Sequence, residues 1–206
     1  MKKKKFIIVL IILVICGFIL WNTIRTKEKE SIEHKNEIEK EVSQEIKDYL
    51  QKESEIKLKT LQALIKDNGI TNLDFEFGSC SLDEDDNLYV LSYLIKQNDN
   101  ITASIISFYF DEEQYLLSKA TYYYNMDDIS GNYEPIDETT NLYITMCLPF
   151  SIDPIAFEDV DNTKLISMYS EMYEKEYAFL SGYKISITNF YNKQWLYAYE
   201  KILPLS

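Results

Sequence analysis

The chain has 206 residues, of which 46% are hydrophobic, and its 34 acidic residues outnumber its 21 basic ones to give a net charge of −13. This length suits one domain with an appendage rather than two full domains. Residues 67–206 carry 24 acidic residues against seven lysines, a net charge of −17. This part of the chain repels phosphate backbones, so we expect no nucleic-acid partner.

The N-terminus has the pattern of a membrane anchor. A basic tail over residues 1–5 precedes an unbroken apolar run from Phe6 to Trp21. Positive charge stays on the cytoplasmic side of a membrane, so the sequence predicts a single transmembrane helix over residues 6–24 with the N-terminus in the cytoplasm. The bulk of the chain would then lie outside the cytoplasmic membrane. The residues that mark the anchor and its flanks are Lys2, Lys3, Lys4, Lys5, Phe6 and Trp21.

Two alternatives remain open for this segment. A cleaved signal peptide would need a small-x-small site after the apolar run, and none is evident near residues 20–30. A lipoprotein would carry its lipid on Cys16, but Ile15 stands where the attachment motif has a small residue. We therefore favour an anchor that is retained.

Residues 25–66 predict a charged helical arm. The segment contains neither glycine nor proline, and Asp67-Asn68-Gly69 is a typical helix end. Its apolar stripe moves to another side of the helix after Ile56, which argues against the constant seam of a coiled coil. We expect a stalk whose last turns pack on a core, and pairing of the arm with a second copy stays open. The first stripe is Ile38, Val42, Ile46, Tyr49, Leu50 and Ile56, and the second is Leu58, Leu61 and Ile65.

Residues 67–206 predict an acidic α+β domain with an antiparallel β-meander. Aromatic and β-branched runs alternate with polar clusters suited to turns. A further strand is predicted where Leu142, Ile144, Met146 and Leu148 alternate, followed by a loop around Pro149 and Pro154. The runs of the meander lie at 73–77, 88–96, 101–110 and 115–124.

The last part of the domain predicts a second helix and a C-terminal β-hairpin. The helix would begin near Asp161 or Asn162 and end at Ser181-Gly182, with Tyr177 and Leu180 on its apolar face. Alternating residues from Tyr183 and again from Trp195 give the hairpin. A helix followed by an antiparallel meander is similar in plan to cystatin-like or NTF2-like domains, which occur in single-pass scaffold subunits. This likeness rests on element order alone.

The chain offers little catalytic chemistry. His34 in the arm is the single histidine, so the acidic domain has no imidazole for general-base, Ser-His or Cys-His catalysis. No glycine-rich phosphate loop occurs either. We therefore expect no enzyme and no cofactor. A hydrolase that uses only carboxylates stays open, and it would need two acids in one cleft.

The acidic clusters do not match a known metal site. The run Asp83 to Asn87 resembles a calcium loop, but Leu88 and Leu94 stand where an EF-hand needs glycine and glutamate. Aspartate and asparagine favour turns for backbone reasons alone. We therefore expect no metal site, although weak calcium binding here or at residues 159–162 remains an alternative.

Two cysteines, Cys80 and Cys147, belong to the acidic domain. A location outside the cytoplasm permits a disulfide between them, but two separate buried thiols are the favoured interpretation. Their spacing excludes a Cys-x-x-Cys redox or zinc motif.

Tyrosine is the residue in excess. Tyr122, Tyr123 and Tyr124 place rings on both faces of one predicted strand. Exposed tyrosines suit contact with proteins or glycans, because they combine apolar area with a hydroxyl. These three residues are therefore a candidate interaction surface, although half-buried sheet positions also favour tyrosine.

The sequence thus favours a membrane-anchored, non-catalytic module that binds a protein partner outside the cytoplasmic membrane. An immunity protein that protects the membrane and a scaffold subunit of a bacterial envelope machine would both have this plan. The alternatives are a ligand or calcium sensor that acts through a partner, and the carboxylate-dependent hydrolase.

Overall fold

The computed structural model describes residues 42–125, 133–191 and 194–202. The predicted tail (1–5), the predicted anchor (6–24) with Cys16, and residues 25–41 of the arm with His34 lie outside them. Among the residues that are described, no helix is long and apolar enough to cross a membrane.

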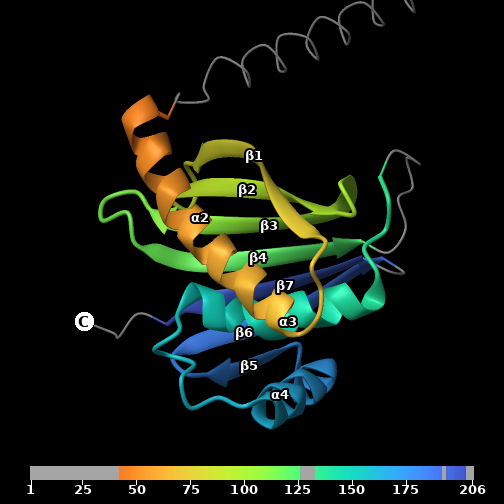
Figure 1. The fold of residues 1–206 in the computed structure, drawn as a ribbon. Helices are drawn as coiled ribbons and strands as arrows, with labels where there is room; N and C mark the ends of the chain where they lie inside the picture. The colour runs from red at the N-terminus through yellow and green to blue at the C-terminus, as the bar shows by residue number, and fades with distance from the viewer. Residues whose placement is uncertain (1–41, 126–132, 192–193, 203–206) are drawn as a thin grey trace, which may run out of the picture. The chain divides into compact units, whose positions relative to one another are not determined.

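One antiparallel sheet of seven strands organises the acidic domain (Figure 1). Its order is β1-β2-β3-β4-β7-β6-β5, so the predicted meander forms one half and the C-terminal strands complete the other. The predicted α+β class with an antiparallel sheet is therefore confirmed. The strands are β1 (Leu73–Asp83), β2 (Leu88–Gln97), β3 (Asn100–Asp111), β4 (Leu117–Asn125), β5 (Tyr177–Leu180), β6 (Tyr183–Tyr191) and β7 (Gln194–Lys201).

Three helices are described, where the sequence predicted the arm and one more. They are α2 (Gln44–Asp67), α3 (Glu138–Ile152) and α4 (Asn162–Lys175). Helices α2 and α3 cross the same face of the sheet, and α4 lies beside β5 (Figure 1). Side chains of β2 show the two faces, because Leu91, Tyr93 and Ile95 are buried beneath the helices while the alternate residues are half-buried.

Helix α2 packs on the sheet over most of its length rather than by its last turns alone. Ser43 caps it by accepting a hydrogen bond from the N–H of Ile46. Gly69 follows the helix with a φ of 93°, in the left-handed region that its predicted role requires. Buried positions recur every three or four residues along one face: Leu50, Ser54, Leu58, Leu61 and Ile65.

The predicted strand over Leu142, Ile144, Met146 and Leu148 is wrong, because these residues belong to helix α3. In an alternating apolar pattern, residues four positions apart are also apolar, and such residues lie about one turn apart on the same face of a helix. The buried residues of α3 recur with a helical period: Thr140, Ile144, Thr145, Cys147, Leu148, Pro149, Ser151 and Ile152.

Helix α3 begins at a side-chain cap and contains a proline. The Asp137 carboxylate accepts a 2.8 Å hydrogen bond from the N–H of Thr140, which fixes the first turn. Pro149, which the sequence placed in a loop, lies inside the helix near its C-terminal end. It has no N–H to donate to the carbonyl oxygen of Thr145, four residues earlier.

The second predicted helix is shorter than expected. Asp161 caps α4 as predicted, but the helix ends at Lys175 and Glu176 follows with a φ of 65°. Residues 177–180 form edge strand β5, so the placement of Tyr177 and Leu180 on a helix face is wrong. Ser181 and Gly182 both have positive φ and turn β5 into β6. The predicted hairpin of the last two strands is present as β6 and β7.

Candidate functional site

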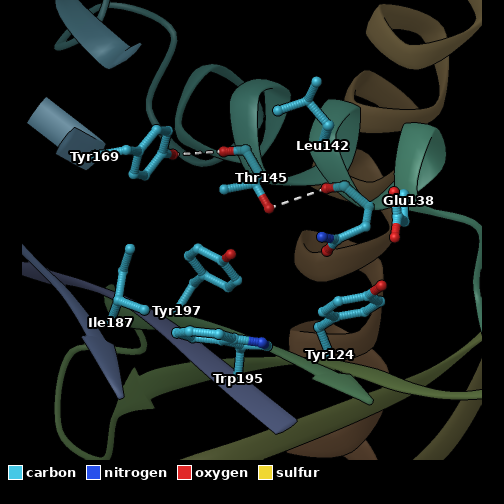
Figure 2. A pocket seen from close by; sticks show the side chains of 9 residues that line it. Tyr124, Glu138, Leu142, Thr145, Tyr169, Ile187, Trp195 and Tyr197 are labelled. Atoms are coloured by element: carbon cyan, nitrogen blue, oxygen red, sulfur yellow. Dashed lines mark hydrogen bonds between the residues drawn. The ribbon is translucent and has the colours of Figure 1, made fainter. Parts of the chain in front are cut away.

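A pocket of about 350 Å³ lies between helix α3 and strands β4, β6 and β7, with one residue from α4 (Figure 2). Its volume is in the range of small-ligand and side-chain binding pockets. Four of its nine lining residues are aromatic. The nine lining residues are Tyr124, Glu138, Asn141, Leu142, Thr145, Tyr169, Ile187, Trp195 and Tyr197.

The sheet supplies an aromatic wall through the register of two strands. Tyr124 on β4 pairs with Trp195 on β7, and Tyr122 pairs with Tyr197. Paired residues point to the same face, and so do positions two residues apart. The rings of Tyr122 and Tyr197 stack with centroids 5.9 Å apart and an interplanar angle of 19°. This register therefore places all four rings beneath α3.

Helix α3 supplies the opposite wall. Spacings of three or four residues place four side chains on one face of this helix: Asn141 and Leu142 follow Glu138 at these spacings and precede Thr145 at them. Thr145 Oγ1 donates a 2.9 Å hydrogen bond to the carbonyl oxygen of Asn141. Because the Asp137 cap fixes where the helix begins, it also fixes which side chains face the strands.

Two tyrosine hydroxyls form hydrogen bonds to the Thr145 carbonyl, which has no helical N–H donor because residue 149 is a proline. Tyr169 Oη donates a 2.7 Å hydrogen bond to the Thr145 carbonyl, and Tyr199 Oη lies 3.1 Å from the same oxygen. The two hydroxyl oxygens are 3.0 Å apart. Burial raises the pKa of both tyrosines, so both hydroxyls remain protonated at neutral pH. This cluster connects α3, α4 and β7 behind the pocket.

Three residues form a polar corner at one end of the pocket: Tyr124, Glu138 and Asn141. Figure 2 shows the side chain of Tyr124 below that of Glu138 on α3. Tyr124 is only 3% exposed. Neither Tyr124 Oη nor Asn141 Oδ1 has a hydrogen-bond partner among the described residues. Most buried polar atoms are paired, so these two atoms retain hydrogen-bonding capacity that the described residues do not use.

Electrostatics keeps the polar corner negative. Glu138 is exposed in the first turn of α3, directly after the capping residue Asp137. Burial raises the pKa of Tyr124, and the two nearby carboxylates raise it further. The tyrosine is therefore a neutral hydroxyl and the charge of the corner comes from Glu138.

The three candidate tyrosines of the sequence separate in the structure. Tyr122 and Tyr124 are buried on the helix-covered face, and Tyr123 is half-buried on the other face. Tyr124 lines the pocket and Tyr122 supports it through its ring stack with Tyr197. The structure thus brings only part of the predicted surface to one place.

The two cysteines are free thiols on different elements. Cys80 is half-buried on β1, and Cys147 is buried on α3. Burial raises the pKa of Cys80, and it raises that of Cys147 to about 11. Both side chains are therefore protonated thiols at neutral pH.

The acidic clusters act as turn and cap residues. Asp83 Oδ1 accepts a hydrogen bond from the N–H of Asp85, and Asn87 has a φ of 53°. Asp161 Oδ1 accepts a 2.8 Å bond from the N–H of Lys164 and so caps α4. Across the described ranges, no group of three histidine, cysteine, aspartate or glutamate side chains is placed to hold a metal ion.

Three site residues were not predicted from the sequence: Glu138, Asn141 and Trp195. The alternation of Trp195 and Tyr197 indicated a strand, but the sequence did not indicate that this strand pairs with the one that contains Tyr124. Comparisons of the chain with models of known protein families, with curated proteins and with solved structures found no match. The predicted likeness in plan to cystatin-like or NTF2-like domains is therefore not established.

Proposed function

We propose that this chain is a single-pass membrane protein whose acidic domain, outside the cytoplasmic membrane, binds a protein partner through the pocket and catalyses no reaction. The observation that carries the proposal is the pocket itself, which is walled by aromatic rings and bordered by two buried, unpaired polar atoms. Pockets lined by aromatic side chains and a few polar groups typically receive one anchoring side chain or a small ligand.

The composition of the pocket favours binding over catalysis. Among its described lining residues, Glu138 is the single carboxylate, whereas a carboxylate-dependent glycosidase uses a pair. Thr145 Oγ1 donates to a backbone carbonyl and contacts no base. Tyr169 has a pKa raised by burial, which makes it a poor proton donor at neutral pH. These groups hold and orient better than they transfer protons.

The mouth of the pocket favours a macromolecular partner. Leu142, an apolar residue on α3, is 53% exposed at the pocket. An exposed leucine beside a concave aromatic wall is typical of the contact around an anchoring side chain. The predicted anchor would keep this surface attached to the membrane, as an immunity protein or an envelope scaffold subunit requires.

Site-specific crosslinking in intact cells tests the proposal. The photoreactive amino acid p-benzoylphenylalanine replaces Leu142 at the pocket, or Ile56 on the exposed side of α2, in a full-length chain with a C-terminal tag. The two positions are matched, at 53% and 52% exposure. We expect one defined crosslinked protein from position 142 and none from position 56, with the product identified by mass spectrometry.

A variant that blocks the mouth of the pocket completes the test. Leu142→Arg places a bulky charge at the mouth, and we expect it to remove the crosslink formed by a second probe at Ile187, which also lines the pocket. Equal crosslinking from positions 56 and 142, or none from either pocket position, would contradict the proposal. Accessibility of the C-terminal tag to protease in cells without an outer barrier tests the predicted topology separately.

A further inference from the structure

Hydrogen-bond acceptors are the main polar groups of the polar corner. A carboxylate such as Glu138 only accepts, and the unpaired Asn141 Oδ1 is also an acceptor. Tyr124 Oη is a hydroxyl that can accept as well as donate, and it has no partner among the described residues. No lysine, arginine or histidine occurs among the described residues that line the pocket. The group that would satisfy this corner is therefore a hydrogen-bond donor, and a positively charged one gains most.

The aromatic wall favours the same charge. In Figure 2 the side chains of Tyr124, Trp195 and Tyr197 line the side of the pocket opposite α3. Aromatic faces carry partial negative charge and attract ammonium groups that lie within about 6 Å of the ring centroid. A pocket that combines such rings with one carboxylate attracts cations more strongly than neutral groups.

The N-terminus of α3 does not turn the site into an anion site. A free helix N-terminus carries about half a positive charge. Here the side chain of Asp137 already accepts the N–H of Thr140, and Glu138 adds a second carboxylate in the first turn. The two negative charges therefore exceed the helix dipole, and the net charge of −17 over residues 67–206 acts in the same direction.

We infer that the pocket binds a primary ammonium group carried on an apolar stem, the chemistry shared by a lysine side chain and a free alkylamine. The ammonium group would lie in the polar corner, and its stem would pass between Leu142 and the rings of the sheet. A primary ammonium has three N–H donors for these acceptors, which a quaternary one lacks. This inference rests on the proposed function of the same pocket.

Fluorescence titration of the full-length protein in an uncharged detergent tests the inference. The chain has two tryptophans, so Trp21→Phe leaves Trp195 in the pocket as the single reporter. The probes are pentylammonium, the neutral 1-pentanol and the anionic pentanoate. We expect saturable binding of pentylammonium, binding of 1-pentanol weaker by at least about tenfold, and no binding of pentanoate.

Two variants separate charge recognition from a structural effect. Glu138→Gln should weaken pentylammonium binding about two- to fivefold, and Asn141→Asp should strengthen it, since it adds a negative charge to the corner. The matched control is Glu45→Gln, which removes an exposed glutamate from the first turn of α2 and should leave binding unchanged. Far-ultraviolet circular dichroism confirms that each variant is folded.

Two further probes distinguish the sources of the ammonium group. Tighter binding of Nα-acetyl-lysine methylamide than of putrescine would assign the site to a lysine of the partner, and the opposite order would assign it to a free amine. Binding of 1-pentanol equal to that of pentylammonium, or an unchanged affinity in Glu138→Gln, would overturn the inference. In that case a crosslink from position 142 would still support the proposed partner, so the two failures are distinguishable.

Discussion

Tyr169 on α4 donates a 2.7 Å hydrogen bond to the backbone carbonyl of Thr145 on α3. Within an unbroken helix this carbonyl would accept the N–H of the residue four positions later, but that residue is Pro149. The proline thus removes one bond within a helix and leaves the acceptor for a bond between two helices. The hydroxyl oxygen of Tyr199 on β7 lies 3.1 Å from the same carbonyl oxygen, so the sheet also bonds to α3 at this point.

We expect Tyr169→Phe to lower the free energy of unfolding by about 1–2 kcal/mol, because it removes the shorter of the two tyrosine hydrogen bonds to this carbonyl. The loss should be smaller in a Pro149→Ala background, where alanine at position 149 supplies the helical N–H. Urea unfolding of the four proteins of this double-mutant cycle measures the coupling. Tyr49→Phe on the exposed side of α2 is the control. Equal losses in both backgrounds would contradict the mechanism.

A second prediction concerns how α2 is held on the sheet. The buried hydroxyl of Tyr93 on β2 donates a 3.1 Å hydrogen bond to Ser54 Oγ, which itself donates to the Leu50 carbonyl. Ser54→Ala should lower the melting temperature and the free energy of unfolding, by about 1–2 kcal/mol, since Tyr93 Oη loses its shorter hydrogen bond and keeps only the 3.5 Å one to the Gln51 carbonyl. Thr60→Ala removes a similar bond to the backbone from a less buried position of α2 and should be close to neutral. A similar loss from both variants would count against the role of Tyr93.

The cap of α3 predicts a loss of stability in acid. Burial opposes ionisation of Asp137, but hydrogen bonds from Thr140 and Gln97 more than offset it and hold the pKa below its usual value. The stabilisation is therefore present above the pKa of the unfolded chain, and it is lost as the pH falls through the lower pKa of the folded state.

Asp137→Asn should consequently reduce the dependence of unfolding free energy on pH in the acid range, while asparagine still caps the helix. Urea titrations at a series of acidic pH values measure this slope. Asp161→Asn makes the same change at the cap of α4 and serves as the matched control. If both variants alter the slope by the same amount, the hydrogen bonds of Asp137 are not its cause.

Thiol reactivity offers a fourth prediction. Because burial raises the pKa of Cys147 to about 11, little thiolate is present at neutral pH, and the side chain is also shielded. Iodoacetamide should therefore modify Cys147 slowly in the native protein and rapidly in urea. The rate at which it modifies Cys80 in the native protein should lie between these two rates. Peptide mass spectrometry of the labelled protein measures both rates. A disulfide between the two would appear as a linked peptide before reduction.

The sequence predicted the meander well because β2 and β3 have continuous apolar and aromatic runs bounded by polar turns. It failed at α3, where Leu142, Ile144, Met146 and Leu148 fit both periods and where the capping signal of Asp137 was not used. It also failed at β5, because α4 ends at Lys175 and the residue with positive φ that follows it is Glu176 rather than a glycine.

The pocket was not predictable from local patterns. Tyr124 was identified as a candidate, but its position opposite Trp195 depends on the pairing of β4 with β7, which is set by tertiary packing. The unpaired state of Asn141 Oδ1 likewise arises only when α3 is placed over the strands. Sequence therefore indicated the kinds of residue at the site, and the fold determined which of them meet.

The pairing of β4 with β7 has a further consequence for biogenesis. Tyr122 and Tyr197 are 75 positions apart in the chain, although they stack in the middle of the sheet. A growing chain can form β1 to β4 early, but β4 keeps an open edge until the last strand emerges. The aromatic wall of the pocket is therefore completed last. Chains interrupted before β7 would leave the edge of β4 unpaired and the aromatic wall incomplete, and they would be prone to aggregate through that edge.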